Sequence, residues 1–432
     1  MKYDDKMKDI FLNKRRLLNI FIYFLGIFAL KGASLILTPL YTHVFSTAEY
    51  GSIELANSVY GFLSNIIGLG LCQYLGIEYF HFKNQERTIA IEKNIVIYFL
   101  LATPVLVLIC LISVFDVVNI SGLDSKFILL IGLSSYFMYF SNLCLMLCKN
   151  QQKTTQMTVI QLTIGLLTLA LNYLGVKVLG WNIYSTLTTA TVTNFIFVLI
   201  IPAIYKFDVG IKDVFPHKKE IKTILYISIP LAITGLVNSV LIMGDRWILN
   251  YYCSTSEIGI YSLATKIGSV FELILINTLT VFYAPHIYKN FQDIGTKEAE
   301  KKNRKMFWMY ILISFIFAIG FISMIKWVFP LLIDNRYKES ERYLWIVLIG
   351  DIFIGATYFR TYLINYLKRT KIILVLNVAA MVFNIILNLI FIPKFQIWAA
   401  AGTTAGSYVL MYVLAKYYNS KFFAEADVKK DV

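Results

Sequence analysis

Apolar runs of about 20 residues recur along the whole chain, and they constrain its fold more than any other feature. An α-helix needs roughly 20 apolar residues to cross the ~30 Å hydrocarbon core of a bilayer. With 58% hydrophobic and 15% charged residues among 432, the chain is too apolar to expose its surface to water. The runs are also too long for the alternating strands of a membrane barrel. The sequence therefore predicts an all-α polytopic membrane protein.

The positions of these runs predict twelve transmembrane helices. The first run follows a basic segment, as in a signal peptide, but no cleavage site of small residues comes after it. We therefore expect it to remain as a membrane helix. The predicted spans are 17–41, 52–80, 91–115, 126–148, 157–179, 183–206, 221–250, 258–285, 305–329, 342–367, 371–393 and 397–418.

Two pairs of matching segments indicate that the second half of the chain repeats the first. Residues 46–51 read Ser-Thr-Ala-Glu-Tyr-Gly, and residues 254–259 read Ser-Thr-Ser-Glu-Ile-Gly. A second match aligns the polar face that carries Asn172 with the face that carries Asn388. We therefore expect the two halves to share one architecture.

The repeat predicts two lobes of six helices each. An even number of helices per lobe gives both lobes the same orientation in the membrane, as a parallel repeat. A basic loop between the lobes is expected to serve as the linker. The expected boundaries are 1–206 for the first lobe, 207–220 for the linker, 221–418 for the second lobe and 419–432 for a cytoplasmic tail.

Lys and Arg are distributed unevenly over the predicted loops. The formal net charge is +14, and most of the 40 Lys and Arg lie on one side of the membrane when the amino terminus is placed in the cytoplasm. Cytoplasmic loops of membrane proteins carry such an excess. The pattern predicts that both termini are cytoplasmic, and we expect no nucleic-acid partner. The outer segments hold Lys126, Lys177, Arg336, Lys338, Arg342 and Lys394.

Several cations fall inside the predicted helices, where an ionised side chain costs roughly 2.5 to 3.5 kcal/mol and usually faces a watery cavity or another charge. At about 1.5 Å per residue, Lys31 and Lys266 are expected about 15 and 12 Å below the outer surface. Both are therefore predicted to point into one central, water-filled cavity between the lobes and to bind an anion. Arg246 and Arg360 are further predicted contacts for the substrate, with Arg360 nearer the cytoplasmic end.

Neutral side chains on the same helical faces are expected to line this cavity. Steps of three and four residues from Lys31 return to one face of the first helix. The predicted lining residues are Ser34, Thr38, Asn57 and Asn277.

Acidic side chains within the helices are candidates for coupling transport to a gradient of H⁺ or Na⁺. These are Asp245, Glu272 and Asp351. Alternatively, Asp245 and its neighbour Arg246 lie near a helix end and reach the headgroups. His and acidic residues do not cluster with the spacing of a metal site, so we expect no metal and no other cofactor.

Three groups of motifs, in this order along the helices, carry a resemblance to a known family. The chain resembles the Wzx-type O-antigen and capsule repeat-unit flippases of the MATE-like (MOP) exporter superfamily. It departs from them at residues 394–398, where such proteins usually have a glycine turn. The motifs are Leu37-Thr-Pro-Leu-Tyr41 with Ala48-Glu-Tyr-Gly51, Gly244-Asp-Arg246 with Glu257-Ile-Gly-Ile-Tyr261, and Asn384-Ile-Ile-Leu-Asn388 with Ile392-Pro393 and Ala399-Ala-Ala-Gly402.

The resemblance implies that two six-helix lobes enclose a cavity that opens alternately to either face of the bacterial inner membrane. The implied cargo is an undecaprenyl-diphosphate-linked oligosaccharide, moved from the cytoplasmic to the outer leaflet. Its diphosphate would contact Lys31 and Lys266. Membrane lipids, a polysaccharide polymerase and a chain-length regulator are the implied partners.

Two other classes of protein compete with this interpretation. A MATE-like ion-coupled exporter of drugs, or of another lipid-linked substrate, has the same fold, but the predicted helix 17–41 contains no acid that could bind a coupling ion. A membrane enzyme needs grouped acids, bases or metal ligands, whereas the four histidines lie in separate loops or at helix ends. We therefore expect a transporter and not an enzyme.

Overall fold

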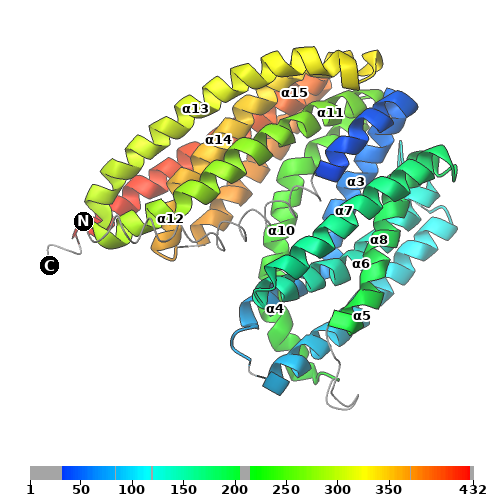
Figure 1. The fold of residues 1–432 in the computed structure, drawn as a ribbon, viewed down its shortest axis with the longest axis horizontal. Coiled ribbons are helices and arrows are strands. Elements are labelled where there is room, and N and C mark those ends of the chain that lie inside the picture. The colour runs from blue at the N-terminus through cyan, green and yellow to red at the C-terminus, as the bar shows by residue number, and fades with distance from the viewer. Residues whose placement is uncertain (1–31, 83, 118–119, 205–214, 370, 429–432) are drawn as a thin grey trace. The chain divides into compact units, whose positions relative to one another are not determined.

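The computed structural model describes residues 32–82, 84–117, 120–204, 215–369 and 371–428 (Figure 1). These residues are helical nearly throughout. Apart from an isolated bridge between Ile120 and Leu123, the described part of the chain has no strand. The predicted all-α class is confirmed.

Contacts within the chain define two compact units. The first comprises the described residues up to Tyr41 together with Ala56–Leu236, and the second comprises Thr42–Leu55 together with the described residues from Val237 onward. Two long helices, α3 and α10, contribute residues to both units. The predicted lobe boundaries rest on the sequence repeat rather than on contacts, and they stay a prediction.

The first unit contains the helices that precede the middle of the chain. Its core is rich in aromatic residues, among which the rings of Tyr98 and Tyr139 stack with their centroids 3.7 Å apart. A helix over 32–44 begins the described chain. The others are the later part of α3 (Thr47–Gly68), α4 (Leu71–Glu78), α5 (Asn84–Val114), α6 (Ser125–Asn150), α7 (Thr154–Lys177), η1 (Asn182–Tyr184), α8 (Ser185–Ile204) and the first part of α10 (Lys218–Tyr252).

The predicted helix 52–80 is not continuous. It is bent by 54° between α3 and α4. Leu69 and Gly70 at the bend have φ values of 50° and 67°, in the left-handed region. A side chain on Gly70 would collide with the Ser228 carbonyl oxygen, only 2.2 Å from an ideal Cβ, so glycine permits the close approach of α10.

The second unit contains the remaining helices, with α12, α13, α14 and α15 running alongside one another in Figure 1. A π-helical segment, η2, interrupts one predicted span. The elements are α11 (Thr255–Phe271), η2 (Glu272–Asn277), α12 (Thr278–Asp293), α13 (Gly295–Leu332), η3 (Asn335–Ser340), α14 (Glu341–Tyr366) and α15 (Lys371–Val428), which follow the second part of α10.

The long helix α15 contains both of the last two predicted spans. Between them, Gln396 has φ 49° and ψ −126°, which is not a helical conformation. Glycine adopts such a positive φ without steric cost, but a residue with a Cβ does not. The segment 394–398, where the resemblance predicted a departure from a glycine turn, therefore contains a glutamine in a strained backbone conformation.

Nine helices of the described chain are long and apolar enough to cross a membrane, or ten when α3 and α4 count as one span. This count treats α15 as one helix. Most of the first predicted helix, 17–41, lies outside the described residues. The multi-pass membrane fold is confirmed, whereas the number twelve stays a prediction.

Candidate functional site

The two matching hexapeptides fold in the same way, each as the start of a helix in the second unit. The Glu49 carboxylate accepts a hydrogen bond from the Ser46 amide at 2.8 Å, and the Glu49 amide donates to the Ser46 hydroxyl. Ser254 and Glu257 form the same reciprocal pair. Such a capping box satisfies backbone donors at the first turn. The sequence match therefore corresponds to a repeated local structure.

These two helix starts pack directly against each other. An ideal Cβ on Gly51 would lie 1.8 Å from the Thr255 carbonyl oxygen, and one on Gly259 would lie 2.1 Å from the Thr47 carbonyl oxygen. The hydroxyls of Thr47 and Ser256 are 2.6 Å apart. We call this contact, made by Thr47–Leu55 of α3 and the start of α11, the α3–α11 junction.

Lys266 lies on α11 two turns beyond Gly259 and takes part in this junction. Its Nζ is 2.9 Å from Glu54 Oε1 on α3. The side chains of Lys266 and Glu54 are 16% and 11% exposed. The Tyr50 ring lies 5.7 Å from the ammonium. Lys266 therefore has a carboxylate partner, which the sequence analysis did not identify.

Arg246 and Asp245, on α10, form a second ion pair with many more contacts. Asp245 is 1% exposed and accepts hydrogen bonds from Tyr261 and from the Arg246 amide. The Arg246 guanidinium donates to Ser262 and Thr265, each at 3.0 Å. Both side chains project from α10 and are buried against α11 and α15, which does not fit the alternative that they reach the headgroups.

A hydrogen-bonded chain continues from Asp245 into α15. Thr404 donates to Asp245 at 3.4 Å and accepts from the Asn384 amide at 3.2 Å. The Asn388 amide donates to Asn384 at 2.9 Å, and the Thr403 hydroxyl donates to Asn388. These contacts join the parts of α15 on either side of Gln396. The predicted polar face of helix 371–393 therefore binds neighbouring helices.

Asp351 and Glu272, two of the predicted coupling acids, lie close enough to interact electrostatically. Oδ2 of Asp351 is buried and has no hydrogen-bond partner among the described residues. An ideal Cβ on Gly268 would be 3.3 Å from this oxygen, so α11 covers it closely. A carboxyl group buried in this way favours its neutral form or a bound cation.

Arg360, on α14, lies beside two aromatic rings. Its guanidinium carbon lies 4.4 Å from the Phe307 ring centroid and 5.9 Å from that of Tyr412. The two rings are parallel within 4°. A guanidinium NH group is 3.5 Å from Glu300, and the Arg360 carbonyl accepts from the Asn419 amide at 2.9 Å. These contacts connect α13, α14 and α15.

The other predicted site residues lie either outside the described residues or in the first unit. Lys31 and the side chain of Asn277 lie outside the described part of the structure. Ser34, Thr38 and Asn57 belong to the first unit. Thr38 is buried, and its hydroxyl donates to the Ser34 carbonyl at 3.0 Å. Its hydrogen bond therefore stays within its own helix.

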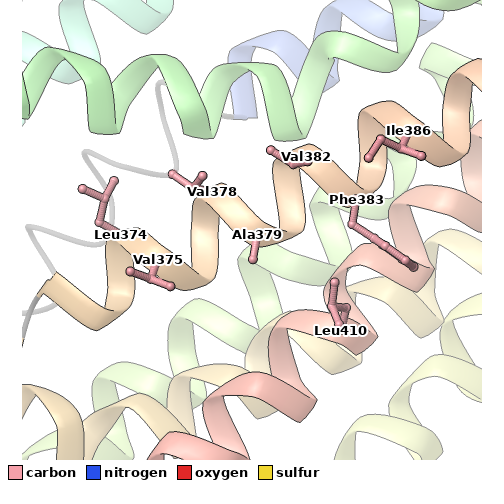
Figure 2. Close-up of a pocket in the computed structure, with 8 residues that line it drawn as sticks. All are labelled: Leu374, Val375, Val378, Ala379, Val382, Phe383, Ile386 and Leu410. Carbon is pink, nitrogen blue, oxygen red and sulfur yellow. The ribbon is translucent and has the colours of Figure 1, made fainter.

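An apolar groove lies along α15 (Figure 2). Its volume is about 610 Å³, and Leu410 from the later part of α15 contributes to its lining. Hydrocarbon fits such a lining, whereas a diphosphate or a sugar would lose its hydration there without replacement. The other lining residues are Leu374, Val375, Val378, Ala379, Val382, Phe383 and Ile386.

Solved structures of transporters share this fold. An inward-facing multidrug resistance MATE family transporter of the MOP superfamily has a TM-score of 0.72 at 10% identity, covering 92% of this chain and 95% of that chain. Lipid II flippase MurJ in an inward closed conformation has a TM-score of 0.71 at 14% identity, covering 95% and 88%. At these identities the likeness shows the fold alone, and it confirms the predicted MATE-like fold.

Sequence similarity identifies the family. Capsular polysaccharide biosynthesis protein CapF of Staphylococcus aureus is 27% identical over 215 residues, which are 47% of this chain and 51% of that protein. The chain thus matches about half the length of this relative. The family described as Polysaccharide biosynthesis protein matches over residues 17–291. Because this match spans more than half of the chain, the protein belongs to the polysaccharide biosynthesis protein family, as its resemblance to MATE-like polysaccharide flippases predicted.

Proposed function

We propose that the protein is a flippase that moves an undecaprenyl-diphosphate-linked oligosaccharide from the cytoplasmic to the outer leaflet of the bacterial inner membrane. Membership of the family supports a role in polysaccharide biosynthesis, and the fold is that of transporters. In this proposal the protein works by alternating access and is not an enzyme. Both termini are cytoplasmic, and a polymerase and a chain-length regulator act on the cargo after it has crossed.

The observation that carries the proposal is the position of Lys266. It is a partly exposed cation inside a membrane helix, and its charge faces a carboxylate instead of lipid. A diphosphate supplies the same kind of partner, since phosphate oxygens form charge-assisted hydrogen bonds with ammonium groups. We assign Lys266 to the diphosphate, together with Lys31. Arg246 and Arg360, which are held by other side chains, position the helices around them.

For coupling to an ion gradient we propose Asp351 with Glu272. The buried Oδ2 of Asp351 has no hydrogen-bond partner among the described residues, and a bound proton or cation would supply one. Asp245 is the weaker candidate, because Arg246 and Tyr261 already satisfy its carboxylate. A proton or Na⁺ exchanged at Asp351 would change the local charge by one unit.

Flipping in reconstituted vesicles tests the proposed cargo. Full-length protein is placed in liposomes with a fluorescent undecaprenyl-diphosphate oligosaccharide, and an impermeant lectin reports sugar on the outer surface. We expect the protein to accelerate exposure and Lys266→Gln to slow it by about tenfold or more. Lys326→Gln is the matched control, because Lys326 is an exposed lysine on α13. Export of cationic drugs without sugar exposure would instead support the drug-exporter alternative.

A pH gradient across the same vesicles tests the coupling site. We expect the gradient to change the flipping rate of the wild type and to have no effect on Asp351→Asn. A gradient response that persists in Asp351→Asn and disappears in Asp245→Asn would move the coupling site to Asp245.

A further inference from the structure

The α3–α11 junction and its surroundings hold two buried or partly buried ion pairs. Glu54 is paired with Lys266, and Asp245 is paired with Arg246. Arg246 also interacts electrostatically with Glu54. The charges cancel within each pair, so neither cation lacks a counter-charge when no ligand is bound. An added anion must therefore compete with a carboxylate that is already in place.

The two cations differ in how firmly they are held. The guanidinium of Arg246 donates to Ser262, Thr265 and Asp245 at the same time. In the described part of the chain, the hydrogen bond of the Lys266 ammonium goes to Glu54. An ammonium is a compact charge on a flexible stem, so Lys266 is able to exchange one anionic partner for another.

Exchange at Lys266 also affects the helix contact. Glu54 follows Gly51 by one helical turn on α3, and Lys266 follows Gly259 by two turns on α11. The ion pair is thus the third contact along the junction, after the Thr47–Ser256 hydroxyls and the two glycines. A group that removes Lys266 from Glu54 removes the charged contact between these helices.

We propose that Glu54 is an internal counter-ion that determines how readily Lys266 accepts cargo. The inference rests on the proposed function. The diphosphate of the cargo displaces the Glu54 carboxylate from Lys266, and the freed carboxylate weakens the α3–α11 junction. Binding of the diphosphate and closure of the junction then oppose each other, because a coupling between two equilibria is reciprocal.

Binding of undecaprenyl diphosphate to the full-length protein in nanodiscs tests this role. Glu54→Gln keeps the size of the side chain and removes the competing charge. We expect it to tighten binding by about fivefold or more, in the usual range of coupling between sites. It should also slow flipping, because no carboxylate at position 54 then competes for Lys266 and helps to release the diphosphate. A structural defect would weaken binding and slow flipping together.

The charge swap Glu54→Lys with Lys266→Glu supplies a second measurement. It restores an ion pair, so thermal stability should stay close to that of the wild type. We expect diphosphate binding to fall by about tenfold or more, since the cation now lies on α3. Undiminished binding in the swap would overturn the assignment.

The outcomes separate this inference from the proposed function. If Lys266→Gln loses diphosphate binding while Glu54→Gln binds with wild-type affinity, Glu54 is not a competitor and the proposed function stands. If neither wild type nor Glu54→Gln binds the diphosphate, both the flippase assignment and the role of Glu54 fail.

Discussion

Two ion pairs of the second unit place a cation beside a glutamate, with the same exposed fraction for each cation. The side chains of Lys266 and Arg360 are each 16% exposed. Both residues fall inside predicted membrane helices, and both are predicted substrate contacts from the same rule about charges in a membrane. Their surroundings nevertheless differ.

The Arg360 guanidinium lies within cation–π distance of both the Phe307 and the Tyr412 rings, and planar guanidinium groups interact well with aromatic faces. Lys266 has Glu54 as its ion-pair partner, and a single ring among the described residues, that of Tyr50, lies near its ammonium. The comparison teaches that the exposed fraction alone does not separate the cation proposed to bind cargo from the cation proposed to position helices. The two differ instead in the number and kind of contacts that each would lose on changing its partner.

Neutralising each pair completely would show the largest difference between them. We expect the double variant Glu54→Gln, Lys266→Gln to abolish surface polysaccharide while changing stability by only about 1 kcal/mol, because both partners are replaced together. The matching variant Glu300→Gln, Arg360→Gln should retain polysaccharide. Immunoblotting of polysaccharide and of protein level measures both. Equal loss in the two variants would remove the distinction.

The glycines of the α3–α11 junction test how rigid the surroundings of Lys266 are. Gly51→Ala should destabilise the protein by about 3 kcal/mol, since overpacking costs of this size arise where nothing can move aside. The obstacle is a backbone carbonyl oxygen. Gly402→Ala on α15 is the control, because nothing lies within 4 Å of its Cβ position. Thermal unfolding in detergent gives the values, and a Gly51→Ala protein as stable as Gly402→Ala would refute the close approach.

Replacing Arg360 by Lys isolates the stacking contribution. The charge next to Glu300 is kept, and the planar group beside the two rings is lost. We expect a loss of about 1 kcal/mol in stability, typical of a partly exposed cation–π contact, with flipping unchanged. Lys266→Arg should show the reverse, with stability retained and flipping reduced. Unfolding and vesicle assays on both variants decide between these patterns.

A change that touches neither pair provides the reference for the second unit. Gln396→Gly should raise stability, because glycine adopts φ 49° without the cost of a Cβ. Strain of this kind is worth about 1 kcal/mol or more, partly offset by the greater freedom of glycine in the unfolded chain. Flipping should not change. A lower unfolding temperature would mean that the glutamine side chain makes a compensating contact.

The exposed pair of Asp334 and Arg336 should show the smallest effect. Arg336 holds the pKa of Asp334 below its usual range, mainly through a side-chain hydrogen bond. The pair therefore stabilises the fold above the unfolded-state pKa of about 4, and the contribution is lost as the pH falls through the lower folded-state pKa. Asp334→Asn should remove this small dependence. Unfolding temperatures of both proteins between about pH 3 and 6 measure it.

Much of the fold follows from patterns that are local in sequence. The apolar runs predict the helices. The two matching hexapeptides each form a capping box, and the contacts of such a box join residues only three positions apart. The break near residues 394–398 was visible as a departure from a glycine turn, and Gln396 occupies it. The bend at Leu69 and Gly70 was missed, since it depends on the approach of α10.

The site was predicted less well, because it depends on partners that are distant in sequence. Lys266 and Glu54 are 212 residues apart, and a helical stripe gives a face but not the side chain opposite. Glu54 lies inside the predicted helix 52–80 and could have been selected by the rule applied to Lys266. The prediction that Asn277 lines the same cavity as Lys266 also assumed a regular α-helix, whereas the π-helical segment η2 ends at Asn277 and changes the turn before it.

The mutual fit of Gly51 and Gly259 has an evolutionary consequence. Each glycine faces a main-chain carbonyl oxygen of the opposite helix, and every amino acid carries that oxygen. A larger residue at one position therefore has no compensating substitution at the other. Among homologues that keep this contact, the two positions should be invariant and should show no pairwise covariation, although they lie against the same contact. Methods that infer contacts from correlated substitutions would fail to detect it for the same reason.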